Sequence, residues 1–153
     1  MRKILLISIL MSFFSFSSDI VGKWYNAVDK NDYDAILEIK KDENEKYSVY
    51  IIEMKNPTYE EGENKGKDKM DLYNEDKSLR TRKLVGLKIV DDLYYNKDRD
   101  YYDKGNIYNP KDGKTYYVYM WLENENILSV KGYIDPLGWF GKTTKWSRFD
   151  EIK

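Results

Sequence analysis

The chain has 153 residues, a formal net charge of −1 at pH 7, and neither a histidine nor a cysteine. Its length suits a single domain, and the near balance of 26 basic against 27 acidic residues gives no general attraction to nucleic acid. The absence of His and Cys excludes Ser–His and Cys–His nucleophilic pairs, thiol redox centres, disulfides and the usual zinc sites, and we expect neither a metal nor a cofactor.

The N-terminal residues 1–17 predict a cleavable secretory signal peptide. Two basic residues precede a mostly apolar run from Ile4 to Phe14, which is too short to span a bilayer as a helix. Small residues then lead to cleavage after Ser17 or Ser18. We therefore expect an exported protein, periplasmic or extracellular, with no membrane span after cleavage. An uncleaved membrane anchor is the alternative.

The mature chain, residues 18–153, predicts one all-β domain. Eight runs that are rich in Tyr, Val and Ile, or that alternate apolar with polar residues, recur between turn signals. The expected strands are residues 20–28, 33–40, 46–55, 83–90, 101–108, 115–122, 127–134 and 142–149. This spacing indicates an antiparallel barrel or sandwich, and a closed barrel of about eight strands leaves no strand edge exposed.

Residues 56–82 interrupt the strand pattern with a stretch dominated by charge. We expect a long surface loop or lid there, with room for a short helix near residues 70–79. Neither acidic cluster, residues 60–63 or Asp91-Asp92, has the ordered spacing of a calcium-binding loop. Both are therefore interpreted as solvated charges.

A hairpin turn is the strongest local signal in the second half of the chain. Asn109, Pro110, Asp112 and Gly113 stand between two expected strands, and we expect the Asp-Gly pair to supply the positive φ angles of the turn.

Four residues at the two ends of the domain predict how the barrel closes. Gly22 and Trp24 lie in the first expected strand, and Trp146 and Arg148 lie in the last. First and last strands are neighbours in a closed barrel, so we expect Trp24 to cover the closed end with the Arg148 guanidinium across its indole. Gly22 would permit close packing there.

Several segments together resemble an exported bacterial family known as domain of unknown function 2147. The most specific segment reads Gly-x-Ile-Tyr-Asn-Pro-x-x-Gly-Lys-x-Tyr over residues 105–116. The others are residues 19–24, 71–74, 79–87, 128–134 and 141–148. The resemblance covers the whole mature domain and implies a lipocalin-like β-barrel in the periplasm or outside the cell, with no established reaction.

Aromatic residues supply the candidate ligand-binding positions. Tyr117, Tyr119 and Trp121 share one face of an expected strand, whose other face is more apolar and is expected to point inward. If the aromatic face points inward, it lines a pocket; if outward, it forms a strip for a protein or glycan partner. Tyr133 is a further candidate, as is Trp139 in an expected rim loop.

The hypothesis from these observations is a non-enzymatic periplasmic binding module for a small apolar or amphipathic ligand. One alternative is a filled barrel that acts as an interaction or structural module with an envelope protein as its partner. Another is an acid–base enzyme that uses Asp, Glu and Tyr. An apolar cavity of about 300 Å³ or more would favour the binding module.

Overall fold

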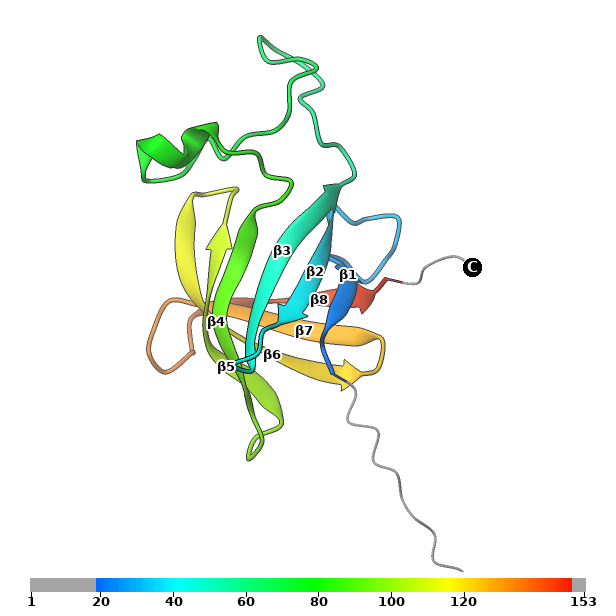
Figure 1. Cartoon of the computed structure of the whole chain (residues 1–153), viewed down its shortest axis with the longest axis vertical. Coiled ribbons are helices and arrows are strands. Elements are labelled where there is room, and N and C mark those ends of the chain that lie inside the picture. The colour runs from blue at the N-terminus through cyan, green and yellow to red at the C-terminus, as the bar shows by residue number, and fades with distance from the viewer. Residues whose placement is uncertain (1–18, 150–153) are drawn as a thin grey trace, which may run out of the picture.

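Eight strands, each hydrogen-bonded to the next along the chain, close into an antiparallel barrel in the computed structural model (Figure 1). The structure describes residues 19–149, so the predicted signal peptide at residues 1–17 lies outside it. Because β1 pairs with both β2 and β8, no strand edge is left open. The prediction of an all-β barrel of about eight strands is confirmed. The strands are β1 (Gly22–Tyr25), β2 (Ala35–Lys41), β3 (Lys46–Met54), β4 (Lys88–Asn96), β5 (Tyr101–Asn109), β6 (Lys114–Asn124), β7 (Ile127–Tyr133) and β8 (Gly141–Arg148).

Alternation along each strand sets which side chains enter the barrel. In β6 the side chains of Val118 and Met120 are completely buried, whereas the side chain of Tyr117, the residue before Val118, is half exposed. The more apolar face of β6 therefore points inward, as the sequence pattern predicts, because successive side chains of a strand leave it on opposite sides.

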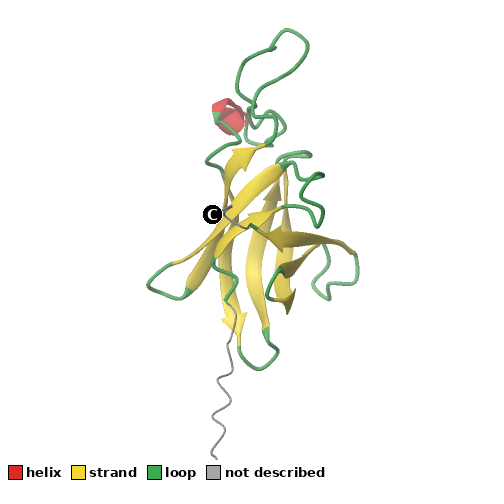
Figure 2. Ribbon diagram, turned by 90° about the vertical axis from the view of Figure 1, so that its right-hand side faces the viewer, coloured by secondary structure: helices red, strands yellow, loops and turns green. Residues whose placement is uncertain are grey.

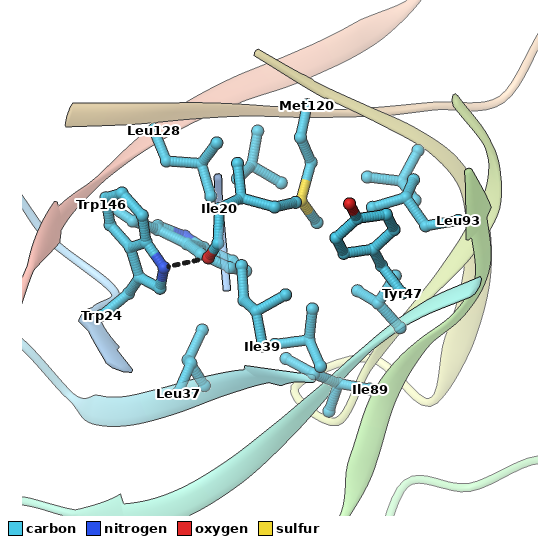
Figure 3. Close-up of a cluster of buried hydrophobic side chains, with 14 of the residues drawn as sticks. Ile20, Trp24, Leu37, Ile39, Tyr47, Ile89, Leu93, Met120, Leu128 and Trp146 are labelled. Carbon is cyan, nitrogen blue, oxygen red and sulfur yellow. Dashed lines mark hydrogen bonds between the residues drawn. The ribbon is translucent and has the colours of Figure 1, made fainter. Parts of the chain in front are cut away.

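One end of the barrel is filled with side chains (Figure 3). Trp24 lies at its centre, fully buried, and its indole N–H donates to the carbonyl oxygen of Ile20 at 2.8 Å. Tyr47 and Tyr102 meet edge to face with ring centroids 4.9 Å apart. The chain enters the barrel at this end, and the β2–β3, β4–β5 and β6–β7 turns also lie there. This end of the barrel is therefore closed.

The fourth strand begins later than the sequence indicates. It covers Lys88–Asn96 rather than residues 83–90, because a turn at Gly86, with φ +92°, precedes it. The acidic pair Asp91-Asp92 lies inside this strand at an irregularity of the β3–β4 register, where Asp92 adopts φ +58°. Lys88 and Lys46 pair with these carboxylates at 2.6 and 2.5 Å.

The long connection between β3 and β4 stands above the other end of the barrel (Figure 2). It holds one short 3-10 helix, η1 (Lys77–Thr81), rather than a helix over residues 70–79. The Asp76 carboxylate begins η1 by accepting the backbone N–H of Ser78. Within residues 19–149 no helix has the length and apolar character needed to cross a bilayer.

Candidate functional site

A cavity of about 730 Å³ occupies the barrel on the side away from the filled end. Its inner wall is apolar, because it is formed by inward side chains of several strands that also belong to or pack against the hydrophobic core. These are Leu37, Ile51, Ile89, Ile107, Val130 and Trp146. The cavity opens at the end that carries the β1–β2, β3–β4, β5–β6 and β7–β8 connections, where Asn26, Leu84, Pro110 and Phe140 also line it.

The mouth of the cavity carries charge. Lys111 Nζ lies 2.8 Å from the Asp34 carboxylate, and both side chains are largely exposed. Asp112 and Lys142 also line the opening. An apolar interior with charged groups at the opening can hold a molecule that has an apolar body and a polar end.

Asp112 and Tyr116 form the titratable pair at this mouth. Burial alone would raise the pKa of Asp112, but hydrogen bonds from the Tyr116 hydroxyl and the Lys114 backbone N–H outweigh it and hold the pKa below its usual value. The same hydrogen bond to Asp112 raises the pKa of Tyr116. At neutral pH the pair is thus a carboxylate and a phenol, which suits hydrogen bonding better than proton transfer.

A buried carboxylate fastens the long loop to the barrel beside the mouth. Asp71 is completely buried and accepts hydrogen bonds from Arg82 Nε at 2.8 Å, from Asn74 Nδ2 at 2.9 Å and from the Tyr108 hydroxyl. The Arg82 guanidinium also lies over the Tyr108 ring. Burial, followed by the bond to Asp71, raises the pKa of Tyr108, so its hydroxyl stays protonated as the donor. Tyr108 also lines the cavity, which links the loop to the cavity wall.

The β5–β6 turn makes a second attachment for this loop. It has four residues, and Gly113 alone supplies a positive φ, +73°, whereas we expected the Asp112-Gly113 pair to supply it together. A Cβ on Gly113 would overlap the carbonyl oxygen of Tyr73 in the long loop. Glycine is therefore needed here both for the backbone conformation and for the close approach of the loop.

Substituting Gly113 by alanine is expected to destabilise the protein by about 2–4 kcal/mol, since left-handed strain of about 1–2 kcal/mol adds to the displacement of Tyr73. Gly62→Ala is the matched control, because Gly62 also has a positive φ, +77°, but nothing lies within 4 Å of its Cβ position. Urea unfolding of both variants measures the difference. Equal losses would show that the contact with Tyr73 contributes nothing.

The fastened loop also forms one wall of a second, smaller hollow of about 410 Å³. Tyr59, Met70, Leu72 and Tyr73 of the loop face Met54 and other rim residues across it. Asp34, Met54, Leu84, Pro110 and Lys111 line both hollows. The loop thus lies beside the opening and extends its apolar surface outward.

The structure brings the four expected closure residues together. Trp24 is paired with Arg148 across β1 and β8, and the guanidinium carbon lies 4.2 Å from the centre of the indole. Arg148 also donates to the backbone carbonyls of Asp19, Val21 and Glu125. Trp146 is buried beside them and lines the cavity.

Gly22 has a different role from the one expected. An added Cβ would make only ordinary contact, 3.7 Å from Arg148, so close packing does not require glycine. The backbone conformation at Gly22 does require glycine, because φ is +123°, a value that residues with a side chain rarely adopt.

None of the five candidate ligand-binding residues lines the cavity. Tyr117, Tyr119, Trp121 and Tyr133 form a strip on the outer wall, with Tyr117 and Tyr133 stacked at 5.5 Å and Tyr119 and Trp121 at 5.4 Å. Trp139 lies exposed in the β7–β8 loop. A ligand inside the barrel would therefore contact other residues, and binding on the outer strip stays a prediction.

The apolar cavity wall and the attachment of the loop are absent from the site residues that the sequence predicts. Strand alternation predicts that Leu37 and Ile51 point into the barrel, but it does not show which inward side chains border an empty space. Asp71 and Tyr108 had a stronger signal, because they lie in segments 71–74 and 105–116 that carry the family resemblance. Among the described residues, no three acidic side chains converge closely enough to hold a metal ion.

Comparison with known proteins agrees with this architecture. The family model described as "Uncharacterized protein conserved in bacteria (DUF2147)" matches residues 22–148. Among solved structures, the chain is similar to protein HP1028 from the human pathogen Helicobacter pylori, described as belonging to the lipocalin family. The TM-score is 0.71 and the identity 25%, over 88% of this chain and 86% of that one. No curated protein matches. The lipocalin-like fold expected from the sequence is confirmed.

Proposed function

Because this chain belongs to the DUF2147 family, whose description names no reaction, we propose its function from the cavity: a non-enzymatic module that holds a small apolar or amphipathic ligand inside the barrel. The observation that carries the proposal is the apolar space of about 730 Å³. Ligand pockets typically measure about 300–1,000 Å³, and a barrel of eight strands is just wide enough for one small ligand. A barrel serving only as an interaction or structural module has no need of such a space.

The distribution of charge indicates how the ligand would lie. The inner wall around Ile51, Ile107 and Val130 offers no charged group, so an acyl chain or a flat ring system fits there. Lys142 stands at the opening and lines it. A carboxylate, sulfonate or phosphate at the end of the ligand would meet this cation and Lys111.

The proposed place of action is the periplasm or the outside of the cell. Its support is the signal-like sequence of residues 1–17, which lies outside the described residues. The intact mass of the protein recovered from a periplasmic extract tests this, with a chain beginning at Ser18 or Asp19 as the expected result.

Two measurements test the cavity as the binding site. Native mass spectrometry of protein purified from its own cell envelope shows whether a small molecule accompanies it. Titration with cis-parinaric acid, a fluorescent fatty acid, reports binding in an apolar space without knowledge of the natural ligand. If neither measurement detects a bound molecule, the proposal is wrong.

Adjacent threonines on β8 provide a matched pair of variants. Thr144 lines the cavity and pairs with the inward Val130, whereas Thr143 pairs with the outward Lys131. Thr144→Phe should fill part of the space and weaken cis-parinaric acid binding about tenfold or more, which is at least about 1.4 kcal/mol. Thr143→Phe, with the same chemical change on the outer wall, should leave binding unchanged. Equal affinities for both variants would place the probe outside the cavity.

A further inference from the structure

The β7–β8 loop, residues 134–140, displays an unusual amount of apolar surface (orange in Figure 1). Trp139, Leu137 and Phe140 are the three most exposed large apolar side chains among the described residues, at 77%, 75% and 68%. Ile134 at the start of the loop is 65% exposed. Single exposed apolar residues are common, but four within seven residues indicate a contact surface.

The loop is held so that these side chains stay outside. Its backbone folds around Asp135, whose carboxylate accepts the N–H groups of Leu137, Trp139 and Phe140 at 3.2, 3.0 and 2.6 Å. Lys131 Nζ closes the loop from the other side with a bond of 2.7 Å to the Gly138 carbonyl. An ordered loop pays little conformational entropy when it binds, because its backbone is already fixed.

Tyrosines and lysines lie beside the apolar tip. The ring of Tyr133 lies against Gly138 of the loop and continues into the outer strip through Tyr117 and Tyr119. Lys131 and Lys142 flank the loop and contribute two positive charges against one acid, a net charge of +1, whereas Lys145 further along β8 is paired with Glu123 at 2.9 Å. The acid is Asp135, which the loop's own N–H groups already engage. The region therefore presents an apolar tip, a neighbouring row of tyrosines (Tyr133, Tyr117 and Tyr119, the tyrosine row) and a positive charge.

We propose that residues 134–140 dock this protein on the surface of a phospholipid bilayer that contains anionic lipid. Leu137, Trp139 and Phe140 would enter the boundary between headgroups and acyl chains, and the tyrosine row would lie at headgroup level, where Tyr and Trp are enriched in membrane proteins. The positive charge favours an anionic surface over a neutral one.

A bilayer explains this surface better than a protein partner does. Stable protein interfaces bury about 800 Å² on each side, far more than the tip of a seven-residue loop offers. A bilayer requires only a shallow apolar insertion with amphipathic side chains around it. Ile134 and Phe140 also line the cavity mouth, so docking would bring the opening next to lipid. The inference goes beyond the proposed function and holds whether or not the cavity is occupied.

Vesicle flotation of the exported protein tests the inference, with vesicles of equal parts phosphatidylethanolamine and phosphatidylglycerol. The protein should float with the vesicles. The double variant Leu137→Ser, Trp139→Ser should have a vesicle partition coefficient at least about tenfold lower, since it loses two apolar side chains that would insert into the bilayer. Val28→Ser is the control, because Val28 is an exposed apolar residue, 55% exposed, on the β1–β2 loop. It should float as well as the parent.

Tryptophan fluorescence identifies the inserted residue. Vesicles should shift the emission of the parent to shorter wavelength, Trp139→Phe should still float but lose the shift, and Trp121→Phe should keep it.

Failure of the parent to float overturns the inference, as does equal flotation of the double variant. Dimerisation that depends on Leu137 and Trp139 would also overturn it by making the tip an interface between copies. Binding of cis-parinaric acid without vesicles should be unchanged in the double variant, so docking and cavity binding fail independently.

Discussion

Replacing Trp24 with alanine is expected to lower the free energy of unfolding by about 3–5 kcal/mol, the usual cost of truncating a large buried aromatic side chain. Trp24 is completely buried in the filled end of the barrel, where Ile20 and Leu128 are buried in the same core cluster. The variant would also release the Ile20 carbonyl from its bond to the indole N–H and remove the ring under Arg148. Each loss falls where β1 meets β8, the shortest pairing in the barrel.

Two comparisons separate these contributions in urea or thermal unfolding. Trp24→Phe keeps an aromatic ring but loses the hydrogen bond, so it should lower the free energy of unfolding by less than Trp24→Ala does. Trp121→Ala makes the same truncation on the outer wall, where the side chain is only partly buried, and should also cost less. A loss below about 1 kcal/mol for Trp24→Ala, the cost of an average substitution, would mean that Trp24 does not close the barrel.

Asp71→Asn is expected to cost about 3 kcal/mol and to loosen the long loop. The Asp71 carboxylate is completely buried and accepts hydrogen bonds from Arg82, Asn74 and the Tyr108 hydroxyl. An amide keeps the shape but has one acceptor oxygen and no charge, so Arg82 loses its ion pair and at least one donor loses its acceptor. Breaking a buried ion pair costs about 3–5 kcal/mol; we take the lower end because Arg82 is partly exposed.

Asp68→Asn makes the same change in the same loop and is the matched control. Asp68 pairs with Lys83 at 2.6 Å, but both side chains are exposed, so the expected loss is below about 1 kcal/mol. Hydrogen exchange provides the local measurement: in Asp71→Asn the backbone amides of Asp71 and Leu84, which are bonded within the loop, should exchange faster. Unchanged exchange would show that the loop is fastened elsewhere.

The last four strands could be predicted within one or two residues, because strong turn signals separate them. Asn109-Pro110 and Gly113 end one strand and begin the next, and Asp135-Pro136 follows β7. β4 could not be placed in this way. Residues 83–87 have the composition of a strand but form a turn at Gly86. The positive φ of +58° at Asp92 could not be predicted either, because aspartate does not require a positive φ.

The candidate site was less predictable than the fold. The aromatic residues of β6 were the most visible candidates, yet they lie outside the barrel because the opposite face, with Val118 and Met120, buries more apolar surface. Composition alone does not rank such residues by position, since tyrosine is stable on either side of a half-exposed sheet. The attachment of the long loop joins Asp71 to Tyr108, 37 residues apart, and no local pattern relates them.

The sequence by itself determined the all-β class, the approximate number of strands and the pairing of Trp24 with Arg148 across the first and last strands. These follow from local turn chemistry, strand periodicity and the closure of a barrel, which depend on residues close in sequence or at the chain ends. Only the tertiary structure decided that one end is filled and the other hollow, because a cavity reflects how side chains from several strands meet in space. It also decided that the side chains of Trp139 and Phe140 stay exposed, since the fold of their loop around Asp135 arises from hydrogen bonds that the sequence pattern does not show.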